Sequence, residues 1–317
     1  MTFDYWNTVT SASEIVLAVY FVIIILKEMK MLSALGICTV SRCQQLQYFI
    51  KEMRLADIHM PMKKVKYGKV LGGFVVAVNT SVMLCLMTVS LYRFRNPLAT
   101  LLVITGLFFD VTITLQFILL VLEMWARFSR LNAVLQDALS PHCTELFVGA
   151  SPSYRCSLLQ LQKTYVALGR AADHLMSHFG LPVAFDIAFC ICGATCSSYE
   201  VLVKLLSDSD VPGPSFGASV RVSEVWLALH WLRILLFSLS CAAAEDTAAA
   251  TGVILIRASV VPQRRTAELD EFLRFTLQGP RTSFSAAGFV KIDRRLIVSA
   301  LTVVVTYLII LGQLTFN

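Results

Sequence analysis

Two ionisable side chains lie deep inside long apolar runs of this 317-residue chain. Asp110 lies about 12 residues, or roughly 18 Å along a helix, from one end of the apolar run 98–124. Arg233 lies about 11 residues from the corresponding end of the run 222–241. A charge in such a run is costly and marks a candidate functional position. We expect the two side chains to lie at one depth and to pair.

Further polar and aromatic side chains gather near the same level. His230 lies about one helical turn from Arg233, and Trp226 lies about one turn beyond His230, so all three share a helix face. Tyr199 and Glu200 occupy the outer third of another apolar run. Such groups can line an outward-facing pocket for a small polar ligand. They can equally form an interhelical ion pair that binds nothing, and both interpretations need the same residues.

Metal and enzyme chemistry have little support. His174 and His178 stand at the i, i+4 spacing that can bind a metal, but the glutamate of a zinc-protease helix is missing, and we expect a polar helix end. Cys190, Cys192 and Cys196 are expected to pack as small buried hydrophobes. The sequence contains no Walker loop, Gly-x-Ser-x-Gly elbow or nucleotide-binding fingerprint. We therefore expect no enzyme activity, no cofactor and no metal.

The elements that must position these residues are membrane-spanning helices. The chain is 56% hydrophobic and 15% charged, with a mean hydropathy of +0.70, whereas soluble domains carry about 25% charged residues. Several apolar runs approach the roughly 20 residues that a membrane helix needs, and no β-barrel alternation occurs. The predicted fold class is all-α, a polytopic helical membrane protein. The net charge of +6 reflects its cytoplasmic segments and does not indicate nucleic acid.

Six spans are predicted, at residues 13–26, 70–91, 98–124, 181–206, 222–241 and 292–314. Lysine and arginine are concentrated in every second segment between them, with nine in 27–69, five in 125–180 and eight in 242–295, against at most two in each alternate segment. The positive-inside rule then places the basic segments in the cytoplasm and both termini outside.

The basic segments mix apolar and polar residues at helical period. We expect residues 27–69, 125–180 and 242–286 to extend the spans as helices that pack together below the membrane. A helix lying on the lipid surface is the alternative.

The C-terminal segment combines a charged start with polar side chains inside an apolar run. A charged cluster at 293–295 precedes a stretch at 296–311 that carries no charge. In hydrocarbon, Thr306, Tyr307 and Gln313 need hydrogen-bond partners or water. We expect them to reach a partner helix or a wet pathway.

This segment closely resembles the C-terminal pattern of insect gustatory receptors. That family ends with Thr-Tyr, five apolar residues and Gln-Phe, and this chain has Thr306-Tyr307, five residues and Gln313-Leu314 after a Gly-Phe and Ile-Asp stretch at 288–293. The Arg-Phe-x-x-Leu-Asn at 127–132 also resembles a family stretch, as do residues 178–182 and 222–226.

The resemblance implies a seven-span ligand-gated cation channel in the plasma membrane, assembled as a tetramer of identical or related subunits. Residues 1–286 would form the ligand-binding bundle with its cytoplasmic helical anchor, and residues 287–317 the pore-lining last helix. Gln313 and Leu314 would form a gate that closes by dewetting, supported by Thr306, Tyr307 and Leu311. The implied partners are a small-molecule tastant, other receptor subunits and membrane lipid.

The chain departs from the family pattern at three points. It has six predicted spans where the family has seven, and we hypothesise that the sequence lacks the first span. Leu314 stands where the family usually has Phe, which predicts a wider gate. Leu308 stands where sugar receptors of the family commonly have Glu, which argues against a sugar receptor.

We predict a gustatory-receptor-like subunit of a nonselective cation channel. The alternatives are a pore-less membrane receptor that signals through a cytoplasmic partner, and a small-solute transporter. The predicted ligand-binding residues are Asp110, Tyr199, Glu200, Trp226, His230 and Arg233.

Overall fold

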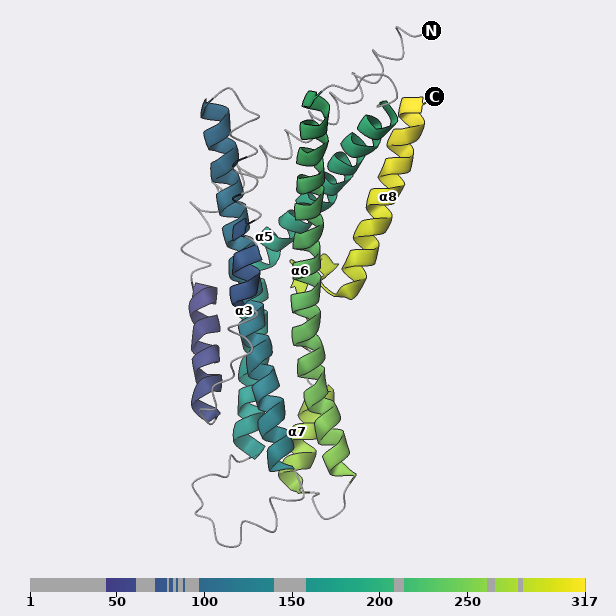
Figure 1. The fold of residues 1–317 in the computed structure, drawn as a ribbon. Coiled ribbons are helices and arrows are strands. Elements are labelled where there is room, and N and C mark those ends of the chain that lie inside the picture. The colour runs from purple at the N-terminus through teal and green to yellow at the C-terminus, as the bar shows by residue number, and fades with distance from the viewer. Residues whose placement is uncertain are drawn as a thin grey trace.

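Long helices make up most of the part of the chain that the computed structural model describes (Figure 1). The described residues are 44–60, 72–78, 80–81, 84, 88, 97–139, 158–207, 214–260, 266–278 and 282–316, without the side chains of 97–110, 204–207, 214–222 and 314–316. The predicted span at 13–26 and the basic stretch at 27–43 lie outside the described residues.

The described elements run in the order α3 (Pro97–Ala138), α5 (Leu158–Ser207), α6 (Pro214–Ser259), α7 (Ala267–Gln278), β1 (Ser285–Ala286), β2 (Val290–Lys291) and α8 (Arg294–Phe316). A further helix covers residues 44–59. Among the described residues, α3, α5, α6 and α8 are long and apolar enough to cross a membrane. The all-α, polytopic membrane fold predicted from the sequence is confirmed.

Three of these helices are much longer than a membrane is thick. With 42, 50 and 46 residues, α3, α5 and α6 extend for about 63, 75 and 69 Å, roughly twice the 30 Å of bilayer hydrocarbon. The 23 residues of α8 extend for only about 35 Å. Figure 1 places α8 beside the upper halves of the long helices and α7 at their lower end. That the lower half is cytoplasmic stays a prediction.

Helix α6 begins at Pro214, eight residues before the predicted span 222–241. Proline is well tolerated in the first helical turn, where its missing N–H has no intrahelical partner to lose. The polar residues that follow it lower the local hydropathy, so the apolar run underestimates the length of the helix.

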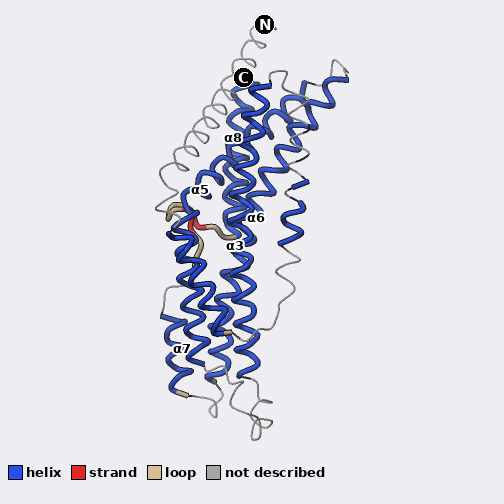
Figure 2. The backbone as a smooth tube through the Cα atoms, turned by 90° about the vertical axis from the view of Figure 1, so that its left-hand side faces the viewer, coloured by secondary structure: helices blue, strands red, loops and turns tan. Residues whose placement is uncertain are grey.

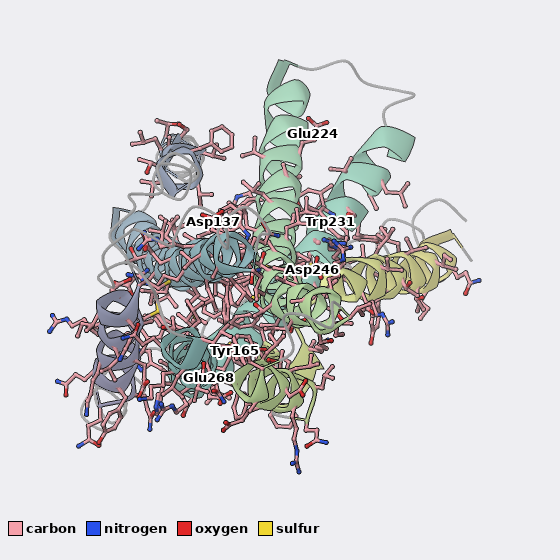
Figure 3. All side chains as sticks on the ribbon, turned by 90° about the horizontal axis from the view of Figure 1, so that it is seen from below. Asp137, Tyr165, Glu224, Trp231, Asp246 and Glu268 are labelled. Atoms are coloured by element: carbon pink, nitrogen blue, oxygen red, sulfur yellow. The ribbon has the colours of Figure 1, made fainter. Side chains whose placement is uncertain are left out.

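Aromatic side chains fill the core between the long helices. Phe117 of α3 contacts Phe179 of α5 and Phe237 of α6, with ring centroids 5.8 and 5.7 Å apart. In the lower bundle, seen from below in Figure 3, Tyr165 packs edge-on against Phe272 of α7 at 6.0 Å. Such tilted contacts stabilise beyond the area that they bury.

Helix α5 changes direction near its middle, and a small hairpin lies against the bend (Figures 1 and 2). Pro182 lies inside α5, where its ring removes a backbone donor and bends the helix. The hairpin pairs Ser285 with Lys291 and joins α7 to α8. Its turn has positive φ at Ala287 (51°) and Gly288 (78°). The sequence analysis did not predict these two short strands.

Helix α8 packs on the bundle along one narrow stripe. Leu296, Ala300 and Val304 are at most 5% exposed, and their spacing of four residues places them in one row. Ala300 packs with Cys190 of α5 and Ile234 of α6. We call Leu296, Ala300 and Val304 the buried stripe of α8. Only 17% of this apolar helix is buried.

Candidate functional site

A buried ion pair joins the three long helices at the level of the candidate pocket. Arg233 of α6 donates from Nη2 to Oδ1 and Oδ2 of Asp186 on α5, at 2.5 and 2.6 Å. The same nitrogen donates to Oγ1 of Thr114 on α3 at 2.8 Å, and that hydroxyl donates to Asp186 Oδ2 at 2.8 Å. Arg233 is 1% exposed, so the charges are almost fully desolvated. Such a pair is stable only with this close geometry.

The sequence analysis predicted Arg233 as a site residue but paired it with a different carboxylate. Asp186 lies inside the predicted span 181–206, so the rule that charges inside spans are functional candidates would have identified it. Asp110 lies in α3, one helical turn before Thr114, but its side chain lies outside the described part of the structure. The predicted contact between Asp110 and Arg233 therefore stays a prediction.

His230 lies one turn above Arg233 and is enclosed by aromatic rings. It stacks on Trp226, with centroids 5.8 Å apart and ring planes 29° apart, and meets the edge of Phe189 at 5.5 Å. A Cβ at Gly193 would lie 2.3 Å from His230 Nε2, so the imidazole occupies space that only glycine leaves. The predicted common face of Trp226 and His230 is present. Gly193 was missed because a glycine inside a helix carries no chemical signal of its own.

Two more predicted site residues lie near the upper end of α5. Glu200 is partly exposed and accepts a hydrogen bond of 2.6 Å from Ser223 Oγ at the start of the described side chains of α6. Tyr199 beside it is only 3% exposed and packs into the bundle. Trp226 is partly exposed. The site therefore has an upper layer, in which Glu200 and Trp226 are partly exposed and Ser223 is buried, and a fully buried lower layer around His230 and Arg233.

The predicted pore residues lie along α8. Thr306 and Gln313 are exposed, Tyr307 is 55% exposed and Leu311 is half-buried. Thr306 donates its hydroxyl proton to the carbonyl of Thr302 at 2.8 Å. This bond satisfies the donor within the helix and leaves the hydroxyl oxygen available as an acceptor. The side chain of Leu314 lies outside the part of the chain that the structure describes.

The expectation of a polar helix end at His174 and His178 is wrong, because both residues lie inside α5, and His174 contacts a neighbouring helix. His174 Nδ1 lies 2.8 Å from Gln45 Oε1, and its ring lies 5.4 Å from that of Tyr48 on the helix at 44–59. Within the described ranges, no group of three metal-ligating side chains occurs. Cys190, Cys192 and Cys196 form no disulfide.

A second polar cluster holds the lower bundle together. Asn132 of α3 donates from Nδ2 to the carbonyl of Thr247 at 2.8 Å, and its Oδ1 accepts from Thr251 at 2.6 Å. Phe128 and Leu131 on the same stretch are fully buried. Arg127 forms a bidentate pair with Asp57 at 3.1 and 2.9 Å. The Arg-Phe-x-x-Leu-Asn motif of the sequence is thus a packing element in the lower half.

Comparisons with known proteins also indicate a chemosensory receptor. A family model described as 7tm Chemosensory receptor matches residues 1–316. The gustatory receptor for sugar taste 43a of Drosophila melanogaster is 26% identical over 157 residues, which are 49% of this chain and 35% of that protein. The aligned part of the chain thus spans about a third of the length of this curated relative.

The fold is also similar to that of a solved receptor. The insect olfactory receptor OR5 from Machilis hrabei has a TM-score of 0.53 at 12% identity, over 94% of this chain and 87% of that chain. The same receptor in complex with eugenol has a TM-score of 0.55 at 12% identity, over 92% and 88% of the two chains. At such identities the likeness shows a shared fold.

Proposed function

This chain belongs to the 7tm chemosensory receptor family, and from this premise we propose that it is a gustatory-receptor-like subunit of a ligand-gated, nonselective cation channel. Membership of the family makes it a receptor of the membrane rather than an enzyme. The proposal adds that four subunits assemble in the plasma membrane, that the last helix of each lines one pore, and that a tastant opens it.

The distribution of polar groups around α8 carries the proposal. At 100° per residue, Thr302, Thr306 and Gln313 fall within about 40° of one another. Their direction lies roughly 140° from the buried stripe of α8, on the far side from the bundle. All three are exposed. In a helix with a mean hydropathy of 2.2, a polar row that faces neither the bundle nor a described partner suits a water-filled pore.

The site between α5 and α6 suits recognition of a small molecule. Glu200 supplies a partly exposed carboxylate that accepts from the buried hydroxyl of Ser223, and Trp226 supplies an aromatic face stacked on His230. These groups converge on the upper end of the bundle, and the eugenol complex of the structural relative supports a small-molecule ligand for this fold. The ion pair of Arg233 lies below this layer and would form its floor.

A cysteine scan along α8 tests the pore. We expect Thr306→Cys to be modified by a water-soluble methanethiosulfonate reagent and to lose current after modification, because it faces the pore. Leu301→Cys is the matched control, since Leu301 is 50% exposed but points about 120° away from the polar row. Equal modification and equal block at both positions would contradict the assignment of the pore face.

Single-channel recording separates the proposal from its two alternatives. Purified protein in planar bilayers should give discrete current steps in response to one of a panel of sugars, bitter compounds and amino acids. A pore-less receptor would give no steps, and a transporter would give substrate flux without them.

A further inference from the structure

The hairpin before the pore helix is held by the two helices that carry the candidate site. Residues in and beside its strands are buried: Ala286 of β1, and Phe284 and Ile292, which flank the two strands, have no exposed surface. The backbone N–H of Ile292 donates to the carbonyl of Phe284 at 2.9 Å, which closes the base of the hairpin. Two residues later α8 begins, with Asp293 Oδ1 accepting from the N–H of Arg295 at 2.8 Å as its N-terminal cap. The hairpin and the start of α8 therefore form one rigid connection.

On one side, the hairpin meets α5 backbone to backbone. A Cβ at Gly180 would lie 3.0 Å from the N and 3.4 Å from the Cα of Ala287, and 3.7 Å from the carbonyl oxygen of Ser285. The absence of a side chain at Gly180 thus permits this close approach. Pro182 follows at the bend of α5, so the contact lies where the helix changes direction. The stretch at 178–182, identified by the family resemblance, thus meets the hairpin directly before the second such stretch, 288–293.

On the other side, α6 holds both strands with one carboxylate. Glu245 accepts the N–H of Phe284 through Oε1 at 2.8 Å, and its Oε2 lies 3.4 Å from Lys291 Nζ. The next residue, Asp246, which is labelled in Figure 3, accepts from Arg294 at 2.7 Å. Glu245 is the stronger of the two attachments, because its side chain is 15% exposed while Asp246 is 62% exposed.

The same two helices also hold α8 higher up. Cys190 and Ile234, which pack with Ala300 of the buried stripe, lie one turn after Asp186 and directly after Arg233. A change in the separation of α5 and α6 at the ion pair therefore reaches α8 at two heights, through the buried stripe and through the hairpin.

We propose that Gly180 and Glu245 are positioning residues for gating, which clamp the hairpin between α5 and α6 and transmit a relative shift of these helices to the start of the pore helix. This proposal rests on the proposed channel function. The contacts constitute a coupling element, because a rigid body attached to two helices must move when the helices separate. A purely structural hairpin predicts a loss of folded protein and nothing else.

The experiment measures Ca²⁺ flux into liposomes that contain the purified full chain, normalised to monodisperse protein. Flux is recorded without agonist and with sucrose, quinine and glycine as probes. Gly180→Ala places a Cβ against Ala287. Gly169→Ala, on the same helix, is the matched control, because no atom lies within 4 Å of a Cβ at that position. Both changes gain the same helix propensity, so their difference isolates the hairpin contact.

We expect Gly180→Ala to change the ligand-free flux or the half-maximal probe concentration by roughly fivefold or more, the lower end of typical allosteric coupling. Gly169→Ala should behave as wild type. Glu245→Gln keeps an acceptor for Phe284 and loses only the charge facing Lys291, whereas Glu245→Leu loses both. The shift should therefore grow in the order wild type, Gln, Leu, while Glu271→Leu at an exposed site of α7 leaves flux unchanged.

Each outcome decides the question. If Gly180→Ala does not fold, the two Glu245 variants test the clamp by themselves. Wild-type flux and wild-type half-maximal concentrations in Gly180→Ala and Glu245→Leu, with only a lower melting temperature, would overturn the clamp and leave the channel intact. A wild-type protein that passes no Ca²⁺ with or without the probes would overturn the proposed function and this inference with it.

Discussion

Breaking the buried ion pair between Asp186 and Arg233 should cost far more stability than breaking an exposed pair of the same residue types. The buried pair is closed at 2.5 Å, with side chains 1% and 8% exposed. The exposed pair, Arg294 with Asp246, is closed at 2.7 Å, with side chains 68% and 62% exposed. The chain thus contains both an experiment and its matched control.

The magnitudes follow from desolvation. Asp186→Leu removes the carboxylate that accepts two buried hydrogen bonds from Arg233, which should cost about 3–5 kcal/mol, and Arg233→Leu should cost a similar amount. The double substitution removes both buried charges and should recover most of that loss, so the interaction energy of the cycle should be about 2 kcal/mol or more. The cycle at Arg294 and Asp246 should give about 0–1 kcal/mol, because water screens both partners.

The assay is thermal unfolding of detergent-solubilised protein, detected by size-exclusion fluorescence. The two double-mutant cycles are measured in parallel. The reasoning predicts that the double variant at the buried pair melts above either single variant. Additive losses at Asp186 and Arg233, or equal coupling energies in the two cycles, would refute the assignment of this pair as a desolvated interhelical contact.

Three further substitutions test separate contacts. Gly193→Ala should lower the free energy of unfolding by about 1–3 kcal/mol, because the new Cβ displaces the His230 ring. Adding His230→Ala to the same chain should remove this clash. Equal melting temperatures for wild type and Gly193→Ala would contradict the contact. Asn132→Ala should cost about 1–3 kcal/mol, because it leaves buried partners in α6 unpaired; a melting temperature within error of wild type would show that the cluster is solvated. Ala300→Leu should overpack the buried stripe at a cost of about 1–3 kcal/mol and change Ca²⁺ flux; unchanged melting and flux would mean that α8 does not pack there.

Much of the architecture could be predicted because it follows from local properties of the sequence. The predicted spans at 98–124, 181–206 and 222–241 lie within α3, α5 and α6, and the span at 292–314 overlaps α8, because apolar length and helical period are properties of consecutive residues. The helix start at Pro214 was missed because polar residues can extend a helix beyond the membrane. The hairpin was missed because strands of two residues have no measurable period.

Some residues of the candidate site could be predicted from the sequence, and others could not. Arg233 could be identified because a charge in an apolar run is conspicuous, and Trp226 and His230 could be placed together because they are one turn apart on one helix. Asp186 and Thr114 lie on other helices, 47 and 119 residues from Arg233 along the chain. Nothing in the spacing of one helix specifies which side chain of another helix will face it.

The sequence by itself determined that the chain is a helical membrane protein, which of the described helices are long and apolar enough to cross a bilayer, and which family pattern its C-terminal segment carries. The first two depend on the transfer of consecutive residues from water to hydrocarbon, which is a sum over local terms, and the third is a pattern of neighbouring residues. Only the tertiary structure decided that Asp186 pairs with Arg233, that Gly193 makes room for His230, and that the hairpin lies between Gly180 and Glu245. These contacts depend on the relative position of helices, which packing fixes only when the whole bundle is assembled.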